Sequence, residues 1–271
     1  MILVTGARGQ LASRVLARLL DRGVPAVGGS RSPAAGERRL DFDDPGSIDL
    51  RGVSTLVLVS AGYAEDDVVI ARHSAVVDAA VRDGVDHIVY SSLAGAGDHL
   101  AFALAHRVTE RMIRSSGVPW TILRNGLYAE LIGSLLTWDD GRLTSAFGDG
   151  AVAAVARDDL AAAAATVATD PGPHRGSTYE LLGHPFTASD VAERLGVQHR
   201  SISLADARQR LLESPGLLPF QPPMLASIAT SIRHGILGDP HPDLEALLGR
   251  PATDPVGVAA ASAPVPAAPE T

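Results

Sequence analysis

The stretch "HRVTE", residues 106 to 110, places an imidazole and a carboxylate four residues apart, about one turn of a helix. In this arrangement His106 and Glu110 could hold a hydroxyl group or supply a proton, because a neighbouring carboxylate stabilises imidazolium. An equally ordinary role for the pair is a polar contact between positions i and i+4 that stabilises the helix. The sequence leaves these roles open and makes His106 a candidate catalytic residue.

A glycine pattern near the N-terminus points to phosphate chemistry. "VTGARGQLA" spaces Gly6, Gly9 and Ala12 evenly between an apolar run and an amphipathic stretch. Gly6 permits a tight turn, Gly9 lets backbone N–H groups approach a pyrophosphate, and Ala12 allows a helix to pack closely on a strand. The pattern predicts dinucleotide binding, and the alternative is a strand-to-helix turn without a ligand.

The residues after the second apolar run indicate whether the cofactor is NAD or NADPH. A carboxylate there would accept hydrogen bonds from the ribose 2′-hydroxyl of NAD, but this chain has Gly29, Ser30 and Arg31. Arg31 can hold a 2′-phosphate through two parallel N–H donors, and Arg8 in the glycine turn could reach the same phosphate. The sequence therefore favours NADPH, unless Arg31 is only a solvated loop charge.

Composition excludes several kinds of chemistry. All 23 basic residues are Arg, so a Schiff base, a Walker-type phosphate loop and a catalytic lysine are impossible in this chain. The chain has no Cys, which removes disulfides and thiolate metal sites, and we expect no metal site. A net charge of -8 without clustered cations argues against a nucleic-acid partner.

The length of 271 residues and the apolar content of 46% allow one large domain or a domain with a smaller lobe. No apolar run approaches the roughly eighteen residues of a membrane span, and no basic signal region precedes the first apolar run. We therefore expect a cytoplasmic protein that does not enter a membrane.

The elements that must position these residues follow a regular rhythm over residues 1–125. Short apolar runs alternate with amphipathic stretches that close on Gly, which is typical of parallel strands joined by crossover helices. The strands are expected at residues 2–5, 24–30, 38–42, 55–60, 87–92 and 120–125. This pattern predicts an α/β protein, a Rossmann-type doubly wound parallel sheet with a small C-terminal α+β lobe.

Beyond residue 125 the alternation loosens. "RDDLAAAAATVATDPG" predicts a helix and "TYELLG" a strand, so residues 150–183 are expected to return to the main sheet. Residues 126–149 and 184–256 are expected to form the small lobe, which would bind the substrate. The Ala- and Pro-rich residues 257–271 have little to bury and are expected to be disordered.

In their order and spacing, the segments "VTGARGQLA", "SRSPAA", "DFDDP", "ARHSAVVDAAVRDGVDHIVYSS", "HRVTE" and "TILRNGLYAEL" resemble the NmrA-like branch of the atypical short-chain dehydrogenases. The chain looks most like the NADPH-dependent quinone oxidoreductases of that branch. The resemblance is strong over about residues 1–130 and continues to "LLGRPAT". It implies a Rossmann domain, a small lobe over the nicotinamide end, and either a reductase or a redox sensor.

The resemblance also implies roles for matching residues. The pyrophosphate turn would comprise Gly6, Arg8, Gly9, Gln10 and Leu11, with Arg31 at the 2′-phosphate. Asp41 and Phe42 would flank the adenine, and Ser60, Ala61 and Gly62 would line the path of the ribose and nicotinamide. Asn125 would lie near the carboxamide. Two departures from the family pattern, Arg8 for a small polar residue and Ala12 for a third glycine, are both compatible with binding NADPH.

Typical members of the wider superfamily use Tyr-x-x-x-Lys as an acid pair, where this chain has His106 and Glu110. Quinones and conjugated cations accept hydride without such a pair, because their products can take a proton from water. The missing pair therefore points to a quinone or a related flat conjugated acceptor rather than to an ordinary ketone. Tyr128, after the last core strand, is the first candidate for a substrate-facing hydroxyl, and its alternative is a half-buried aromatic at a lobe junction.

Other readings of the same residues stay open. Ser91 and Ser92 follow the fifth strand, where the superfamily often has a catalytic Ser, but they could equally cap the strand end. Trp138, Phe147 and Phe220 suggest an apolar pocket wall. The rivals to a reductase are a non-catalytic NADP(H) sensor with a protein partner and a tailoring isomerase or dehydratase. The sequence leaves the oligomeric state open, with a homodimer as one possible assembly.

Overall fold

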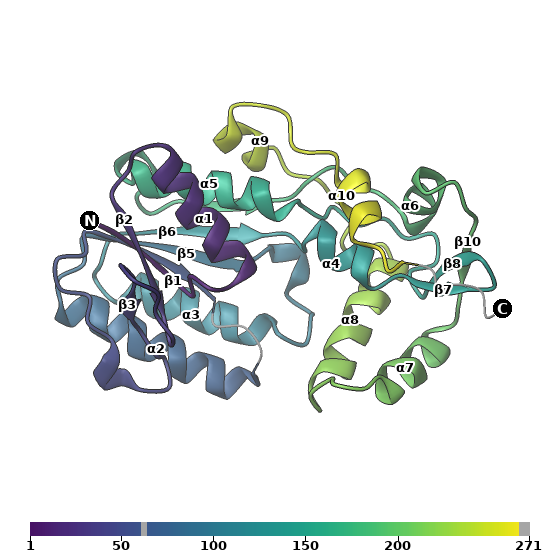
Figure 1. Ribbon diagram of the computed structural model, residues 1–271, viewed down its shortest axis with the longest axis horizontal. Helices are drawn as coiled ribbons and strands as arrows, with labels where there is room; N and C mark the ends of the chain where they lie inside the picture. The colour runs from purple at the N-terminus through teal and green to yellow at the C-terminus, as the bar shows by residue number, and fades with distance from the viewer. Residues whose placement is uncertain (61–63, 266–271) are drawn as a thin grey trace.

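The computed structural model describes residues 1–60 and 64–265. A seven-stranded sheet forms the larger unit, with strand order β3-β2-β1-β4-β5-β6-β9 and every neighbouring pair parallel (Figure 1). The strands are β1 (Ile2–Thr5), β2 (Ala26–Ser30), β3 (Arg38–Arg39), β4 (Thr55–Val59), β5 (His87–Leu93), β6 (Trp120–Asn125) and β9 (Thr178–Leu181). The doubly wound sheet predicted from the sequence is confirmed.

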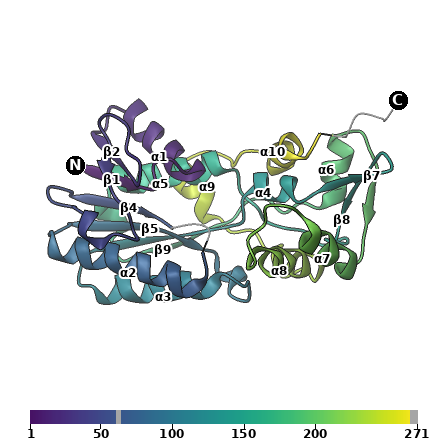
Figure 2. The same cartoon turned by 60° about the horizontal axis from the view of Figure 1, so that its bottom comes forward.

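Helices cover both faces of this sheet (Figures 1 and 2). On one face lie α1 (Gln10–Asp21), α5 (Arg157–Thr169) and α9 (Asp243–Leu248), and on the other α2 (Asp66–Arg82) and α3 (Ala103–Ser115). Strand side chains alternate accordingly: Val4 and Val57 pack under α1 and α5, while Leu3 and Leu56 pack under α2. This two-sided burial explains why the central strands β1 and β4 are almost wholly apolar.

A smaller unit lies beyond the carboxyl ends of the strands (Figure 2). It contains α4 (Ala129–Ser134), α6 (Ala188–Arg194), α7 (Leu204–Glu213), α8 (Gln221–Arg233) and α10 (Pro255–Ser262). Its three-stranded sheet has the order β10-β8-β7, built from β7 (Thr137–Asp139), β8 (Arg142–Ser145) and β10 (His199–Ser201). A separate apolar cluster, which includes Leu143, Phe147 and Ile228, holds this lobe together. Short 3₁₀ turns occupy Pro45–Ser47, Gly95–Gly97 and Gly172–His174.

The C-terminal part of the chain differs from the expectation in two places. Residues 257–262, expected to be disordered, lie within α10, which Asp254 caps by accepting from the N–H groups of Val256 and Gly257. Ala259 is fully buried against Gly133 of α4, so small residues here allow close helix contact rather than disorder. Helix α9, from the range assigned to the lobe, packs on α5 and β9 of the main sheet. No helix in the described part of the chain is both long and apolar enough to cross a membrane.

Candidate cofactor and acceptor site

The glycine turn between β1 and α1 is shaped to receive an anion. Gly6 has φ +65°, which favours glycine, and a Cβ on Gly9 would lie 3.1 Å from the Gly6 carbonyl oxygen. Helix α1 begins at Gln10 with no acid in its first turn, and within the described residues no side chain caps it. Its N–H groups and the positive end of its dipole therefore fit a pyrophosphate. The roles of Gly6, Arg8, Gly9, Gln10 and Leu11 stay predictions.

An acidic residue that was not predicted from the sequence, Glu37, lies beside the end of β2. The carboxylate of Glu37, from the loop before β3, accepts hydrogen bonds from Ala34 N at 2.8 Å, Ser30 Oγ at 3.3 Å and Arg8 Nε at 3.4 Å. The hydrogen bond from Ala34 is the main cause that lowers the pKa of Glu37. Arg31 is exposed beside this cluster. The only sequence signal was an isolated Glu in "AAGERR", seven residues past Ser30.

Asp41 and Phe42 lie just after β3, where an adenine was expected. Phe42 is half-buried against the cluster beneath α2, and Asp41 donates its backbone N–H to the Ser47 hydroxyl at 2.9 Å. Their neighbour Asp43 is held by Arg72 of α2 at 2.6 Å and 2.8 Å. These residues lie along one side of the edge that the carboxyl ends of β1, β2 and β3 form.

The residues expected along the nicotinamide path follow β4 and end β6. The Ser60 N–H donates to the Ser91 hydroxyl at 3.0 Å, while Ala61 and Gly62 lie outside the described residues. Asn125 ends β6, and its buried Oδ1 has no hydrogen-bond partner among the described residues. A buried acceptor without a donor is costly, so a ligand N–H such as that of a carboxamide fits this position.

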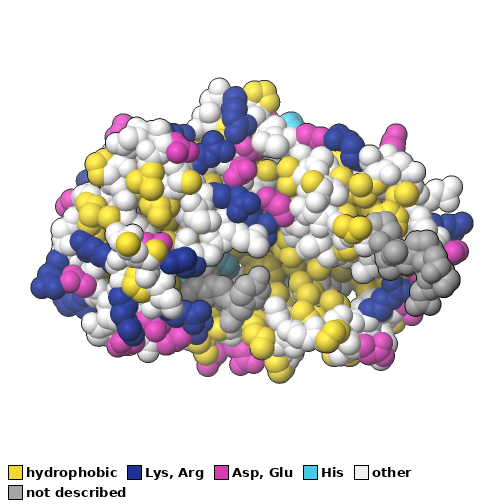
Figure 3. Space-filling view, in the orientation of Figure 1, with side chains coloured by type: hydrophobic (Ala, Val, Ile, Leu, Met, Phe, Trp, Pro, Cys, Tyr) yellow, Lys and Arg dark blue, Asp and Glu magenta, His cyan; other side chains and the backbone are white. Residues whose placement is uncertain are grey.

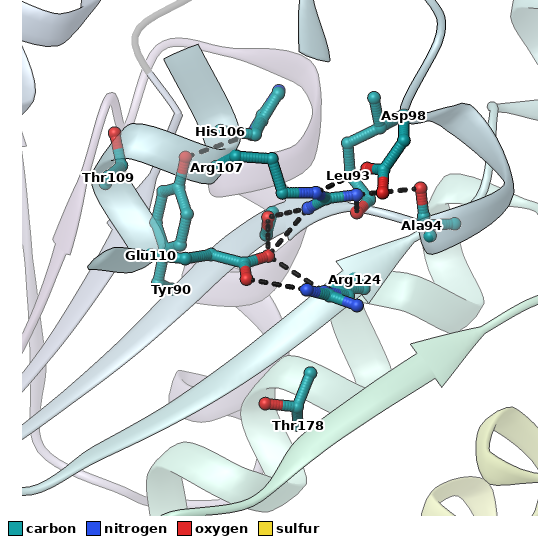
Figure 4. Close-up of polar contacts among 12 residues, drawn as sticks. Tyr90, Leu93, Ala94, Asp98, His106, Arg107, Thr109, Glu110, Arg124 and Thr178 are labelled. Carbon is teal, nitrogen blue, oxygen red and sulfur yellow. Dashed lines mark hydrogen bonds and ion pairs between the residues drawn. The ribbon is translucent and has the colours of Figure 1, made fainter. Parts of the chain in front are cut away.

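His106 does not pair with Glu110; its partner is Tyr90 of β5 (Figure 4). The distance between Tyr90 Oη and His106 Nδ1 is 2.9 Å, and Tyr90 is fully buried. Burial, followed by the charge of Arg107, lowers the pKa of His106 to about 4, while burial raises the pKa of Tyr90. The charge of Glu110 acts in the expected direction and raises this pKa, but burial outweighs it, so His106 is a neutral imidazole near neutral pH.

Glu110 instead belongs to an arginine network (Figure 4). Its buried carboxylate contacts Arg124 at 2.8 Å, Arg107 at 2.7 Å and Arg114 at 3.1 Å, and accepts from Ser92 Oγ at 2.6 Å. Burial alone would raise the pKa of Glu110, but hydrogen bonds from Arg124 and Ser92 and the arginine charges lower it to about 2. Arg107 and Arg114 lie on α3 itself, whereas Ser92 and Arg124 come from β5 and β6.

The same network holds the loop after β5. Arg107 donates to the carbonyl oxygens of Leu93 at 2.9 Å and Ala94 at 3.1 Å. Arg124 also binds Glu180 at 3.0 Å, and Glu180 accepts from Gly95 N at 2.8 Å. Ser91 and Ser92 thus both have partners in the structure, Ser60 N for the first and Glu110 for the second. Strand ends, helix α3 and the loop are fixed together where the candidate site lies.

A small apolar cavity of about 20 Å³ lies at the junction of the two units, lined by Leu93, Gly97, Leu127, Val152 and Leu237 among others. In the space-filling view the molecule is hollowed between the units, and hydrophobic side chains gather on the lobe side (Figure 3). The aromatic residues expected as a pocket wall do not line this cavity. Phe147 is buried in the lobe core, and the Trp138 indole donates to Pro264 O at 2.6 Å.

Tyr128 lies at the junction, in the position before α4. The Arg157 guanidinium stacks over its ring at 4.3 Å, and Arg157 also pairs with Glu130 at 3.5 Å. The ring packs against the cluster beneath α1 and α5. Its role toward an acceptor stays a prediction.

A doubly wound parallel sheet with a glycine turn after β1 and an uncapped first helix defines a dinucleotide-binding α/β protein. Residues 6–171 match the NAD(P)H-binding family. Quinone oxidoreductase 2 of Escherichia coli is 35% identical over 277 residues, covering 93% of this chain and 95% of that protein. This chain belongs to the NAD(P)H-binding, NmrA-like family, as the resemblance in its sequence indicated.

Solved structures agree with this assignment. The E. coli NADPH-dependent quinone oxidoreductase in complex with NADPH superimposes with a TM-score of 0.84 at 34% identity, covering 96% of this chain and 99% of that chain. The Citrobacter triphenylmethane reductase in complex with NADP(H) gives the same TM-score of 0.84 at 30% identity, with coverage of 96% and 99%.

Proposed function

We propose that this protein is a reductase that takes hydride from NADPH and delivers it to a quinone or a similar flat conjugated acceptor. The observation that carries the proposal is the 35% identity to the E. coli quinone oxidoreductase along 93% of the chain. The NADPH-bound relative of known structure supports the choice of cofactor. An acceptor that needs no strong acid also suits a site without a Tyr-x-x-x-Lys pair.

Bound NADPH supplies the hydride. The N–H groups at the start of α1 would bind the pyrophosphate, and Arg8 and Arg31 would bind the 2′-phosphate. Asn125 Oδ1 would accept a hydrogen bond from the carboxamide. These residues would orient the nicotinamide toward the junction of the two units, and orientation supplies most of the rate enhancement.

His106 contributes a hydrogen bond rather than an acid. Tyr90 holds its Nδ1, and the other ring nitrogen points away from Tyr90 (Figure 4). With its pKa lowered to about 4, the imidazole is neutral near neutral pH and can contact a ribose hydroxyl or the acceptor oxygen through Nε2. The reduced quinone is a stable phenolate, so it can take its proton from water.

The test follows the absorbance of NADPH with a panel of quinones, using aldehydes and ketones as controls. The expected result is oxidation of NADPH with at least one quinone and little with the controls. Binding of NADPH without turnover of any acceptor would contradict the proposal and indicate a sensor. Conversion of a substrate without net loss of NADPH would indicate an isomerase or dehydratase.

A further inference from the structure

The three donors around Glu37 converge from different parts of the cofactor-binding edge. Ser30 is the last residue of β2, Arg8 lies in the glycine turn, and Ala34 N belongs to the loop between β2 and β3. Only 17% of the Glu37 side chain is exposed, whereas 60% of the Arg8 side chain is exposed. The Glu37 carboxylate is therefore more buried than the Arg8 side chain, and N–H and O–H donors surround it.

The Glu37 carboxylate and its donors lie directly against β2. A Cβ on Gly28 would come within 2.6 Å of the Ala7 Cβ and 3.4 Å of the Glu37 Cγ, so Glu37 lies beside the glycine turn. The end of β2 is where a dinucleotide places its adenosine ribose. A hydroxyl, a backbone N–H and a guanidinium are also the donors that proteins use to hold phosphate. The chain's own carboxylate thus fills a site with the chemistry of a 2′-phosphate subsite.

We propose that Glu37 is a specificity-determining residue that occupies the 2′-phosphate subsite and must be displaced when NADPH binds. This inference rests on the proposed use of NADPH. A phosphate and a carboxylate repel each other at contact distance, so NADPH has to break the contacts of Glu37 with Arg8 and Ser30. NADH carries only a 2′-hydroxyl, which can donate to the same carboxylate without displacing it. Glu37 therefore narrows the preference for NADPH that Arg8 and Arg31 create.

The displacement leaves Glu37 in solvent. Arg31 is exposed next to the cluster, and its charge acts on the neighbouring Asp43, which Arg72 already binds. When the phosphate arrives, Arg8 and Arg31 can close on it from the turn and from the loop. The exchange costs little, because the ion pair that is lost has an exposed arginine.

The test is calorimetric titration of NADPH and NADH into the wild type, Glu37→Gln, Glu37→Asp and the control Asp44→Asn. Asp44 lies after β3, before the 3₁₀ turn at Pro45–Ser47, in an exposed pair with Arg39 at 3.7 Å. Glu37→Gln should bind NADPH at least about threefold more tightly, in line with the energy of an exposed ion pair, and NADH no more tightly. Glu37→Asp and Asp44→Asn should keep a wild-type ratio, the first because it keeps the charge.

Adenosine 2′,5′-bisphosphate and AMP, titrated in parallel, report on the subsite without the nicotinamide. The bisphosphate should gain affinity in Glu37→Gln while AMP does not. Weaker binding of NADPH by Glu37→Gln would overturn the inference, because Glu37 would then hold Arg8 in its binding position. An equal gain for both dinucleotides would also overturn it. Since neither fragment transfers hydride, this outcome is independent of whether any quinone is reduced.

Discussion

Arg31 is the cation whose role can be isolated most cleanly, because its side chain is exposed after β2. Arg31→Ala should weaken binding of NADPH by about tenfold or more and leave NADH unchanged, since a bidentate charged contact contributes about 1.5–3 kcal/mol. Titration of both cofactors checks this, with Arg39→Ala as a matched control in an exposed pair with Asp44. Equal losses for NADPH and NADH would mean that Arg31 has a structural role.

His106 tests whether the helix supplies an acid. His106→Ala should lower quinone turnover by less than the roughly 10²- to 10⁴-fold that follows loss of an essential general acid. Its neutral imidazole, held by Tyr90 at 2.9 Å, is suited to orientation rather than to proton donation. Steady-state kinetics with the best quinone checks the loss, and NADPH affinity is measured separately. A thousandfold fall at unchanged cofactor affinity would identify a working acid.

Tyr128→Phe is the companion measurement. If the hydroxyl faces the acceptor, this variant should raise the acceptor KM while NADPH affinity stays nearly constant. The ring contact with Arg157 at 4.3 Å is kept by Phe. An unchanged KM would leave Tyr128 as a packing residue at the junction.

The sequence could place single residues but not their partners. The spacing of His106 and Glu110 fixed their helix turn, and the glycine pattern located the phosphate turn at Gly6. Tyr90 and Arg124, which bind these two side chains, lie on separate strands 16 and 14 residues away. The pairing of β5 with β6 brings them to α3, and the helical spacing within residues 106–110 carries no information about that pairing.

At the level of elements, Glu110 joins α3 to the ends of β5 and β6. Glu110→Gln should lower the free energy of unfolding by about 1–3 kcal/mol, because Arg124 and Arg107 lose their shared carboxylate but keep Glu180 and Asp98 as partners. Urea denaturation measures the change. Asp158→Asn, which breaks an exposed pair with Arg14 at 3.0 Å, should cost under about 1 kcal/mol. Similar losses in both variants would show that the network contributes no more than a surface pair.

Element prediction succeeded where hydrophobic periodicity was strong. The runs at 2–5, 55–60, 87–92 and 120–125 correspond to β1, β4, β5 and β6 within one residue. Within the run at 38–42 only Arg38–Arg39 form a strand, the short β3. The backbone N–H of Asp41 donates to the Ser47 hydroxyl instead of continuing the strand. Helix α10 was missed, since an Ala-rich segment shows no amphipathic pattern and is buried only through a close approach to Gly133.

The stability of the whole molecule should depend on pH through three histidines whose pKa is lowered by loss of contact with water. Burial lowers the pKa of His106 and His87 to about 4 and that of His73 to about 3, from a usual value near 6.5. The unfolded chain therefore binds more protons, and stability present above about pH 6.5 is lost as the pH falls toward about 4. Glu110, with its pKa lowered to about 2, adds a loss below about pH 4.5.

Urea midpoints measured from pH 8 to pH 4 check this dependence. The midpoint should stay level above about pH 6.5 and then fall. The free energy of unfolding should decrease by on the order of a few kcal/mol in total. His106→Gln should reduce the slope, whereas His184→Gln should not, because the His184 side chain is 65% exposed. A level profile down to about pH 5 would contradict the burial of these neutral imidazoles.

The two units of the molecule should be separable in their binding functions. We propose that residues 1–125 with 150–183 hold the cofactor and that the lobe of 126–149 and 184–256, apart from α9, shapes the acceptor site. Gly133 tests this division from inside the lobe. A Cβ there would lie 2.1 Å from the Ala259 carbonyl oxygen, so Gly133→Ala must push α4 and α10 apart.

Gly133→Ala should lower the free energy of unfolding by about 1–3 kcal/mol, as overpacking does, and raise the acceptor KM. NADPH affinity should stay within about twofold, because the glycine turn, Ser30 and Arg31 lie in the other unit. Gly172→Ala is the matched control, since its Cβ would meet its nearest neighbour, Asp170 Oδ1, at an ordinary 3.6 Å. Urea denaturation, steady-state kinetics and titration with NADPH measure these three quantities for both variants. If cofactor and acceptor binding fell together in Gly133→Ala, the lobe would be coupled to the phosphate end of the site and the proposed division would fail.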